Sequence, residues 1–153
     1  MSKLKEHAIT LYEKVIHYIE CVLDGMPLEK MGEPILQGDK PGALLFHLVA
    51  TPNWWCKQAE KPMPFSSKHE GFDGAIKILN MQLEEFKKRL EDPAEVVWAP
   101  GKSMAWIMIR SAHHMMHHAS MLVYARHIFG MGPLAKDNGW AEIMDLAGEL
   151  NYK

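Results

Sequence analysis

Four histidines lie within six positions of an otherwise apolar run at residues 111–126, and they are His113, His114, His117 and His118. In a helix, residues four apart lie on one face about one turn apart. The run therefore offers two pairs of imidazoles, and each pair can present two nitrogens to a single metal ion. Burying several imidazoles without partners would cost on the order of 1–3 kcal/mol each, which favours a shared metal ion over separate hydrogen-bonded core histidines.

The two pairs differ in their neighbours when the run is projected at about 100° per residue. His114 and His118 share their stripe with Ile107, Met121 and Ala125. His113 and His117 fall on the flank of that stripe, beside Trp106, Arg110 and Tyr124. We therefore favour His114 and His118 as the inward pair, and we keep His113 and His117 as a second register.

A third ligand must come from elsewhere, because two imidazoles do not hold a divalent ion firmly. His47 is the only upstream histidine inside a comparably apolar stretch, residues 43–49. The predicted metal ligands are therefore His47, His114 and His118. Imidazole suits zinc, nickel, iron and copper, and we favour zinc, nickel or iron. Copper is disfavoured, because the 12 methionines of the chain are more typical of adaptable core packing than of thioether ligands.

Apolar residues repeat at helical spacing in four long segments, which must position these histidines. We expect helices at about residues 2–24, 41–60, 71–91 and 103–129, and a short C-terminal helix at 138–148. Ser2 and Ser103 are plausible N-caps, and Gly25 and Gly130 are plausible stops. Glycine and proline at 25–41 predict a long first connection with at most one helical turn at 28–31. A short extended piece is expected at 96–98.

This pattern predicts an all-α fold, a four-helix bundle formed by a single domain over residues 1–153. The helix at 103–129 is apolar nearly all round, so it is either central or at a dimer interface. We expect a homodimer. Leu4, Ala8, Leu11, Val15, Tyr18 and Val22 form the expected buried seam of the first helix.

Composition excludes several classes of partner. The chain has 153 residues, 48% hydrophobic and 24% charged, with a formal net charge of −2. That balance gives no general attraction for nucleic acid, and no apolar run reaches the ~18 residues that span a bilayer. We expect a cytoplasmic protein without a membrane partner. Cys21 and Cys56 are expected to be reduced thiols.

Two motifs resemble the DinB/YfiT-like superfamily of helical-bundle metalloproteins. The first is His47-Leu48 followed by Trp54-Trp55, and the second runs through His114, His118-Ala119, Tyr124, Arg126 and Gly130. The resemblance implies a metal held by His47, His114 and His118. Three positions depart from the family pattern: Ser120 and Met121 stand where Gly and Gln are usual, and Pro52 stands where an acidic residue is common.

Three neutral imidazoles leave coordination positions open for water or substrate, as in catalytic sites. The resemblance implies a metal-dependent S-transferase that uses a low-molecular-weight thiol, and a metal-dependent hydrolase is the close alternative. A non-catalytic metal- or ligand-binding bundle is the alternative from another class. The sequence identifies no catalytic residue; His113, His117 and Tyr124 are proton-transfer candidates by position only.

Overall fold

The computed structural model describes residues 2–35, 38–92 and 103–151, and the side chains up to residue 146. The described part is all-α and contains five α-helices and one 3-10 helix. In chain order these are α1 (Lys3–Leu23), η1 (Leu28–Gly32), α2 (Pro41–Gln58), α3 (Gly71–Glu91), α4 (Met104–Ile128) and α5 (Trp140–Asn151). The predicted helices are confirmed, including the short C-terminal one. The long first connection with one short helical turn is also as predicted. The extended piece expected at 96–98 lies outside the described residues.

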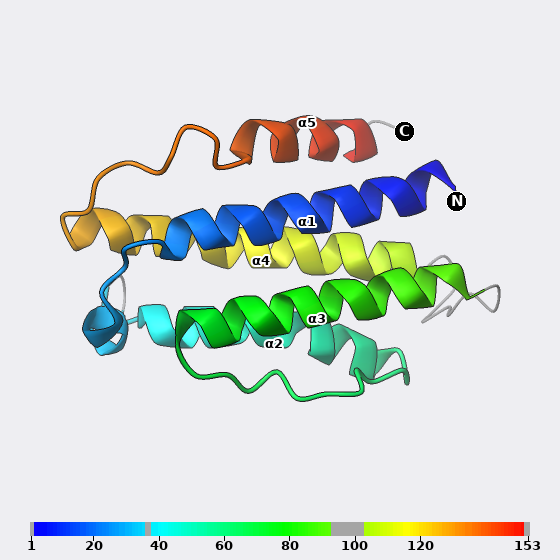
Figure 1. Ribbon diagram of the computed structural model, residues 1–153, viewed down its shortest axis with the longest axis horizontal. Coiled ribbons are helices and arrows are strands. Elements are labelled where there is room, and N and C mark those ends of the chain that lie inside the picture. Colours follow the sequence, from blue (N-terminus) through cyan, green and yellow to red (C-terminus); the bar gives the residue numbers. More distant parts are fainter. Residues whose placement is uncertain (1, 36–37, 93–102, 152–153) are drawn as a thin grey trace.

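The four long helices lie side by side as a helical bundle (Figure 1). α1 and α4 run in one direction, and α2 and α3 run in the other, so the α2–α3 connection returns along the length of the bundle. α4 packs against α1, α2 and α3, whereas α5 lies on the outer side of α1. These contacts bury most of the apolar residues of α4 inside one chain, and the expected homodimer stays a prediction.

The helix ends follow local chemistry that the sequence predicts. The Ser2 hydroxyl accepts a hydrogen bond from the Lys5 backbone N–H at 3.4 Å, and the Ser103 hydroxyl accepts one from the Trp106 N–H at 3.2 Å. Such caps satisfy donors that the first helical turn leaves unpaired. Gly25 follows α1 with φ of +66°, a left-handed conformation that a side chain would strain.

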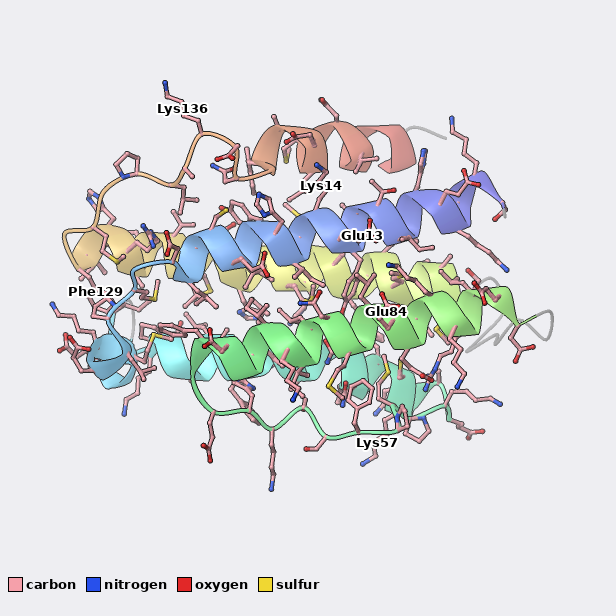
Figure 2. The ribbon with its side chains drawn as sticks, in the orientation of Figure 1. Glu13, Lys14, Lys57, Glu84, Phe129 and Lys136 are labelled. Atoms are coloured by element: carbon pink, nitrogen blue, oxygen red, sulfur yellow. The ribbon has the colours of Figure 1, made fainter. Side chains whose placement is uncertain are left out.

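The core fills the space between the long helices. Five of the six residues predicted for the α1 seam are buried. Leu4 is 46% exposed, so its assignment to the seam is wrong, because the first turn of α1 lies at one end of the bundle. Charged side chains such as Lys57 and Lys136 project from the outside of the molecule (Figure 2). No helix in the described ranges is long and apolar enough to cross a membrane.

A buried glutamine of α3 ties α2 to α1 at the proline of α2. Pro52 lacks the backbone N–H that would continue the helical ladder, yet α2 runs on to Gln58. The Gln82 side chain, which is fully buried, donates from Nε2 to the Val49 carbonyl and to Asn53 Oδ1, both at 2.8 Å. Tyr12 Oη donates to Gln82 Oε1 at 3.3 Å. Gln82 thus holds α2 on both sides of Pro52.

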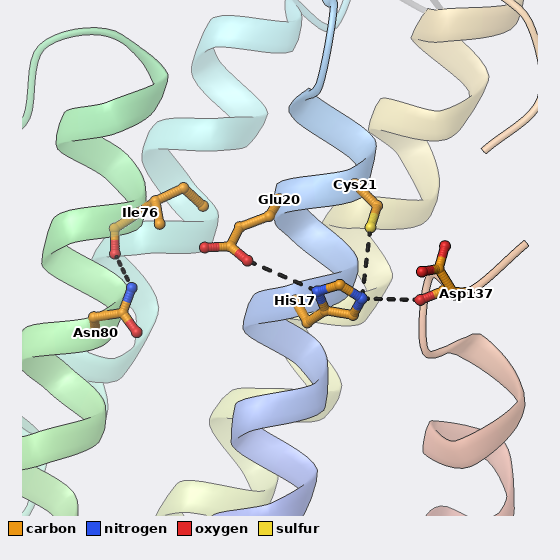
Figure 3. A network of polar contacts seen from close by, with 6 residues as sticks. All are labelled: His17, Glu20, Cys21, Ile76, Asn80 and Asp137. Carbon is orange, nitrogen blue, oxygen red and sulfur yellow. Dashed lines mark hydrogen bonds and ion pairs between the residues drawn. The ribbon is translucent and has the colours of Figure 1, made fainter. Parts of the chain in front are cut away.

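A histidine of α1 fixes the segment before α5. His17 Nε2 donates to the Asp137 carbonyl at 2.9 Å, and the Sγ atom of Cys21 lies 3.8 Å from the same nitrogen (Figure 3). His17 Nδ1 lies 3.8 Å from a carboxylate oxygen of Glu20. Because Nε2 carries the proton given to Asp137, it cannot also accept a proton from Cys21. This cluster is therefore a structural contact and not an activated thiol.

Candidate metal centre

The structure brings the three predicted ligands together in the groove between α2 and α4. His47 comes from the first half of α2, and His114 and His118 come from the middle of α4. The Nε2 atom of His114 lies 3.0 Å from the Nε2 atoms of both His47 and His118. One ring nitrogen from each of the three residues lies within 4.8 Å of the others. The predicted convergence of these histidines is confirmed.

The spacing of the nitrogens fits a shared metal ion. With metal–nitrogen bonds of about 2.0–2.1 Å, two ligands at a right angle are ~3.0 Å apart and two tetrahedral ligands are ~3.4 Å apart. Two nitrogen pairs in the cluster are 3.0 Å apart. Hydrogen bonding explains only one of them, because the His114 Nε2 atom carries either one proton or one lone pair. A single cation would be bound by all three lone pairs.

Electrostatics favours the metal-binding form of two of the rings. Burial is the main cause that lowers the pKa of His118, to about 4, and the neighbouring rings of His114 and His47 lower it further. Asp39, in the connection before α2, acts in the opposite direction. Burial also lowers the pKa of His114, with His47 as the next cause. Both rings are therefore neutral at pH 7, as metal ligation requires.

The outer nitrogen of His118 shows how this ring is held. His118 Nδ1 is buried and has no hydrogen-bond partner among the described residues. Metal-bound imidazoles usually donate this second N–H to a carboxylate or a carbonyl. The His118 ring instead packs against the rings of His47 and His117, with centroid distances of 4.7 Å and 5.0 Å. Ring packing, rather than a hydrogen bond within the described part of the chain, orients this ligand.

The second register of the helix is not part of the cluster. His117 is exposed and lies beside His118, whereas His113 is half-buried. Burial, and secondly the charge of Arg110, lower the pKa of His113. Tyr124 is 44% exposed. None of these three proton-transfer candidates lines the cavity beside the cluster.

That cavity has a volume of about 390 Å³ and lies between α2 and α4. It is lined by His47, Ala50, Thr51, Trp54, Trp55, Arg110 and His114. Trp54 and Trp55 meet edge to face with ring centroids 4.8 Å apart, and Trp55 meets Trp106 at 5.8 Å. The tryptophan pair of the first motif therefore forms an aromatic wall next to two of the three candidate ligands.

Sequence reasoning missed Arg110 as a lining residue. The projection placed it on the flank with the outer histidines, yet it lines the cavity together with His114. The signal was its spacing, because Arg110 precedes His114 by four residues and so lies one turn away on the same side of α4. Ala50 and Thr51 were also missed as lining residues. The signal for them was similar, because both lie about one helical turn after His47 on α2.

The end of the second motif has a structural role. Arg126 donates from Nη1 to the carbonyl of Val22 at 3.0 Å and also to that of Asp24. These groups lie at the C-terminal end of α1, where the last carbonyls of a helix have no partner inside it. A cation there is also favoured by the helix dipole. Arg126 thus joins α4 to the end of α1.

Neither cysteine has the properties of a reactive thiol. Cys56 is fully buried, and burial raises its pKa to about 11. Burial also raises the pKa of Cys21, with the carboxylates of Asp137 and Glu20 as further causes. The thiolate is the reactive form of cysteine. Any thiol chemistry at the centre must therefore use a thiol supplied from outside the chain.

We expect iodoacetamide to leave Cys56 unmodified in the folded protein at pH 8. With a pKa of about 11, only about one thiol in a thousand is ionised at that pH, and the side chain is fully buried. Mass spectrometry of native and urea-unfolded samples measures this, with both cysteines modified after unfolding. Rapid modification of native Cys56 would contradict the structure.

Comparison of the chain with protein-family profiles, with curated proteins and with solved structures found no significant match. Among the residues that the structure describes, His47, His114 and His118 are the group with the geometry to hold a metal ion. The described chain is an all-helical bundle with a three-histidine cluster between α2 and α4 that can hold a metal ion.

Proposed function

We propose that this protein is a metal-dependent enzyme of the thiol S-transferase type. His47, His114 and His118 would bind one divalent transition metal ion, namely zinc, nickel or iron. The observation that carries the proposal is the position of His114 Nε2, which is 3.0 Å from the Nε2 atoms of both other rings. The two motifs further support a DinB/YfiT-like four-helix bundle, in which α2 and α4 supply the ligands.

The surroundings of the cluster support a catalytic site over a closed structural one. Structural zinc sites have four protein ligands, whereas catalytic sites have three and an open position. The group in the described residues has three ligands. The 390 Å³ cavity borders His47 and His114, so a small molecule inside it reaches the centre.

In the proposed reaction, the sulfur of the external thiol attacks an electrophilic carbon. A sulfur–carbon bond forms, the leaving group departs with the electron pair of its bond, and the thiol proton passes to a base or to solvent. An ion held by the three histidines would supply Lewis acidity that lowers the pKa of the thiol. Trp54 and Trp55 hold the organic part of the substrate. His117 is the proposed proton acceptor, because its ring packs beside His118 and is exposed.

A non-catalytic metal-binding bundle is the second candidate, and one observation favours it. His113, His117 and Tyr124 all lie outside the cavity lining, so a proton acceptor would have to act from its edge. A metal-dependent hydrolase would use the same ligands with water as the nucleophile. Turnover separates these candidates, because the non-catalytic protein would retain its metal without transferring a thiol or hydrolysing a substrate.

The test begins with the metal content of untagged protein purified without chelator, measured by elemental mass spectrometry. We expect about one transition metal ion per chain, either as purified or after loading with zinc, nickel or ferrous iron. The loaded protein is then assayed for conjugation of a small thiol to an electrophile, before and after chelator treatment. Failure to bind any of these ions would reject the proposal, whereas stable metal with no turnover would support the non-catalytic candidate.

A further inference from the structure

Arg110 has no polar partner among the residues that the structure describes. The described chain has three arginines: Arg89 donates to Glu85 at 2.8 Å, and Arg126 donates to backbone carbonyls of α1. Arg110 has no hydrogen bond or ion pair with any described residue, although it lines the cavity. A guanidinium group offers five donors in a planar fork that matches a carboxylate. Its place in the cavity therefore indicates an anionic ligand.

The other cavity residues add no opposing charge. The lining contains two histidines, a threonine and apolar residues, but no aspartate or glutamate. The hydroxyl of Thr51 donates to the His47 carbonyl at 2.8 Å, so it is already paired within α2. Arg110 is thus the charged group that a ligand would meet in this cavity.

The remaining wall suits an apolar body. Trp54 is 53% exposed although it belongs to the cavity lining, and its ring is fixed edge to face against Trp55. An exposed indole offers a large, rigid contact surface. Ala50 leaves space beside it. The volume of about 390 Å³ lies in the lower part of the range of small-molecule sites.

We propose that this cavity binds a small organic anion, with the carboxylate of the ligand on Arg110 and its apolar body against Trp54. Arg110 and His114 are four residues apart, so their positions are separated by about 6 Å along the axis of α4. When Arg110 binds the carboxylate, a ligand atom a few bonds from that carboxylate would therefore lie near the three-histidine cluster. Only the role of the anion as a substrate rests on the proposed function, because the binding itself needs no metal.

The experiment compares two probes of nearly the same shape, the charged 3-phenylpropionate and the neutral 3-phenylpropionamide. Both are titrated by calorimetry into full-length protein dialysed against chelator, so that a metal ion cannot bind the carboxylate. We expect the carboxylate to bind at least about tenfold more tightly than the amide, as a charge-assisted, two-point hydrogen bond allows. The Arg110→Gln variant should bind the two probes equally, and Arg110→Lys should keep part of the difference.

Lys136→Gln is the matched control. It removes one exposed positive charge from the segment before α5, on the outside of the molecule (Figure 2). Lys136 is not among the residues that line the cavity. This variant should keep the full preference for the carboxylate. Equal binding of both probes to the native chain, no binding of either, or a preference that survives in Arg110→Gln would each overturn the proposal.

The metal content of Arg110→Gln separates this inference from the proposed function. Arg110 is exposed and is not one of the three clustered histidines, so the variant should still bind about one zinc ion per chain. Loss of anion binding with zinc retained supports the inference. If the native protein prefers the carboxylate but never binds metal, the anion site stands and the proposed enzyme does not.

Discussion

Replacing His118 with alanine should lower the metal content of the purified protein severalfold without loss of helix content. The variant loses one of the three nitrogens that meet between α2 and α4. Removing a residue that merely orients a metal ligand already weakens metal binding about 10–100-fold, so removing a ligand should weaken it at least as much. Elemental mass spectrometry gives the metal content, and far-UV circular dichroism of the same sample gives the helix content.

His117→Ala is the matched control for this experiment. His117 is the adjacent histidine, and its ring packs against His118 at 5.0 Å, but it is exposed and lies outside the cluster. The His117→Ala variant should retain the metal content of the native protein. Full metal in His118→Ala would reject His118 as a ligand. A loss in His117→Ala with none in His118→Ala would assign the ligand pair to the second register.

The sequence predicts the helices and the three-histidine cluster because both depend on apolar patterning and local spacing. The predicted α3 begins and ends at the observed Gly71 and Glu91, since its apolar repeat is interrupted by proline immediately afterwards. The inward pair on α4 follows from the four-residue spacing together with the apolar neighbours of His114 and His118. His47 follows from the same rule, because it is a histidine within an apolar run.

The cavity could not be predicted, because its extent depends on how far α2 and α4 stand apart. A helical projection ranks the residues of one helix by direction, and it places Arg110 at the margin of the inward stripe. A residue at that margin faces either solvent or another helix, and the position of the neighbouring helix determines which of the two it faces. Here Trp54 and Ala50 of α2 form the opposite wall, so Arg110 becomes part of the cavity.

The polar contacts on both sides of Pro52 could not be predicted from the sequence either. Gln82 lies next to the apolar repeat of α3, where a glutamine is ordinarily expected at the edge of the buried face. Its partners include the Val49 carbonyl and the Asn53 side chain, which lie on another helix and about 30 residues earlier. No local pattern pairs them, so the role of this buried amide emerges only from the packing of α3 against α2.

Replacing Gln82 with leucine should lower the free energy of unfolding by about 2–4 kcal/mol, because buried polar groups left without partners cost about 1–3 kcal/mol each. The variant keeps an apolar side chain of similar size but removes three hydrogen bonds. Urea unfolding measures the change. Asn80→Ala is the control, because Asn80 is exposed on the same helix and its amide donates to the Ile76 carbonyl one turn away (Figure 3). This variant should stay within about 0.5 kcal/mol of the native protein.

The same variant should separate the two parts of the candidate site. Gln82 joins Val49 to Asn53 across Pro52, so its loss loosens the second half of α2, which carries Trp54, relative to the first half, which carries His47. Under conditions in which Gln82→Leu remains folded, we expect it to keep its metal but to bind the aromatic carboxylate probe more weakly.

Adding Tyr12→Phe to Gln82→Leu removes the hydroxyl left without an acceptor and should recover part of the lost stability. Equal stability of Gln82→Leu and the native protein would show that the buried amide does not hold α2.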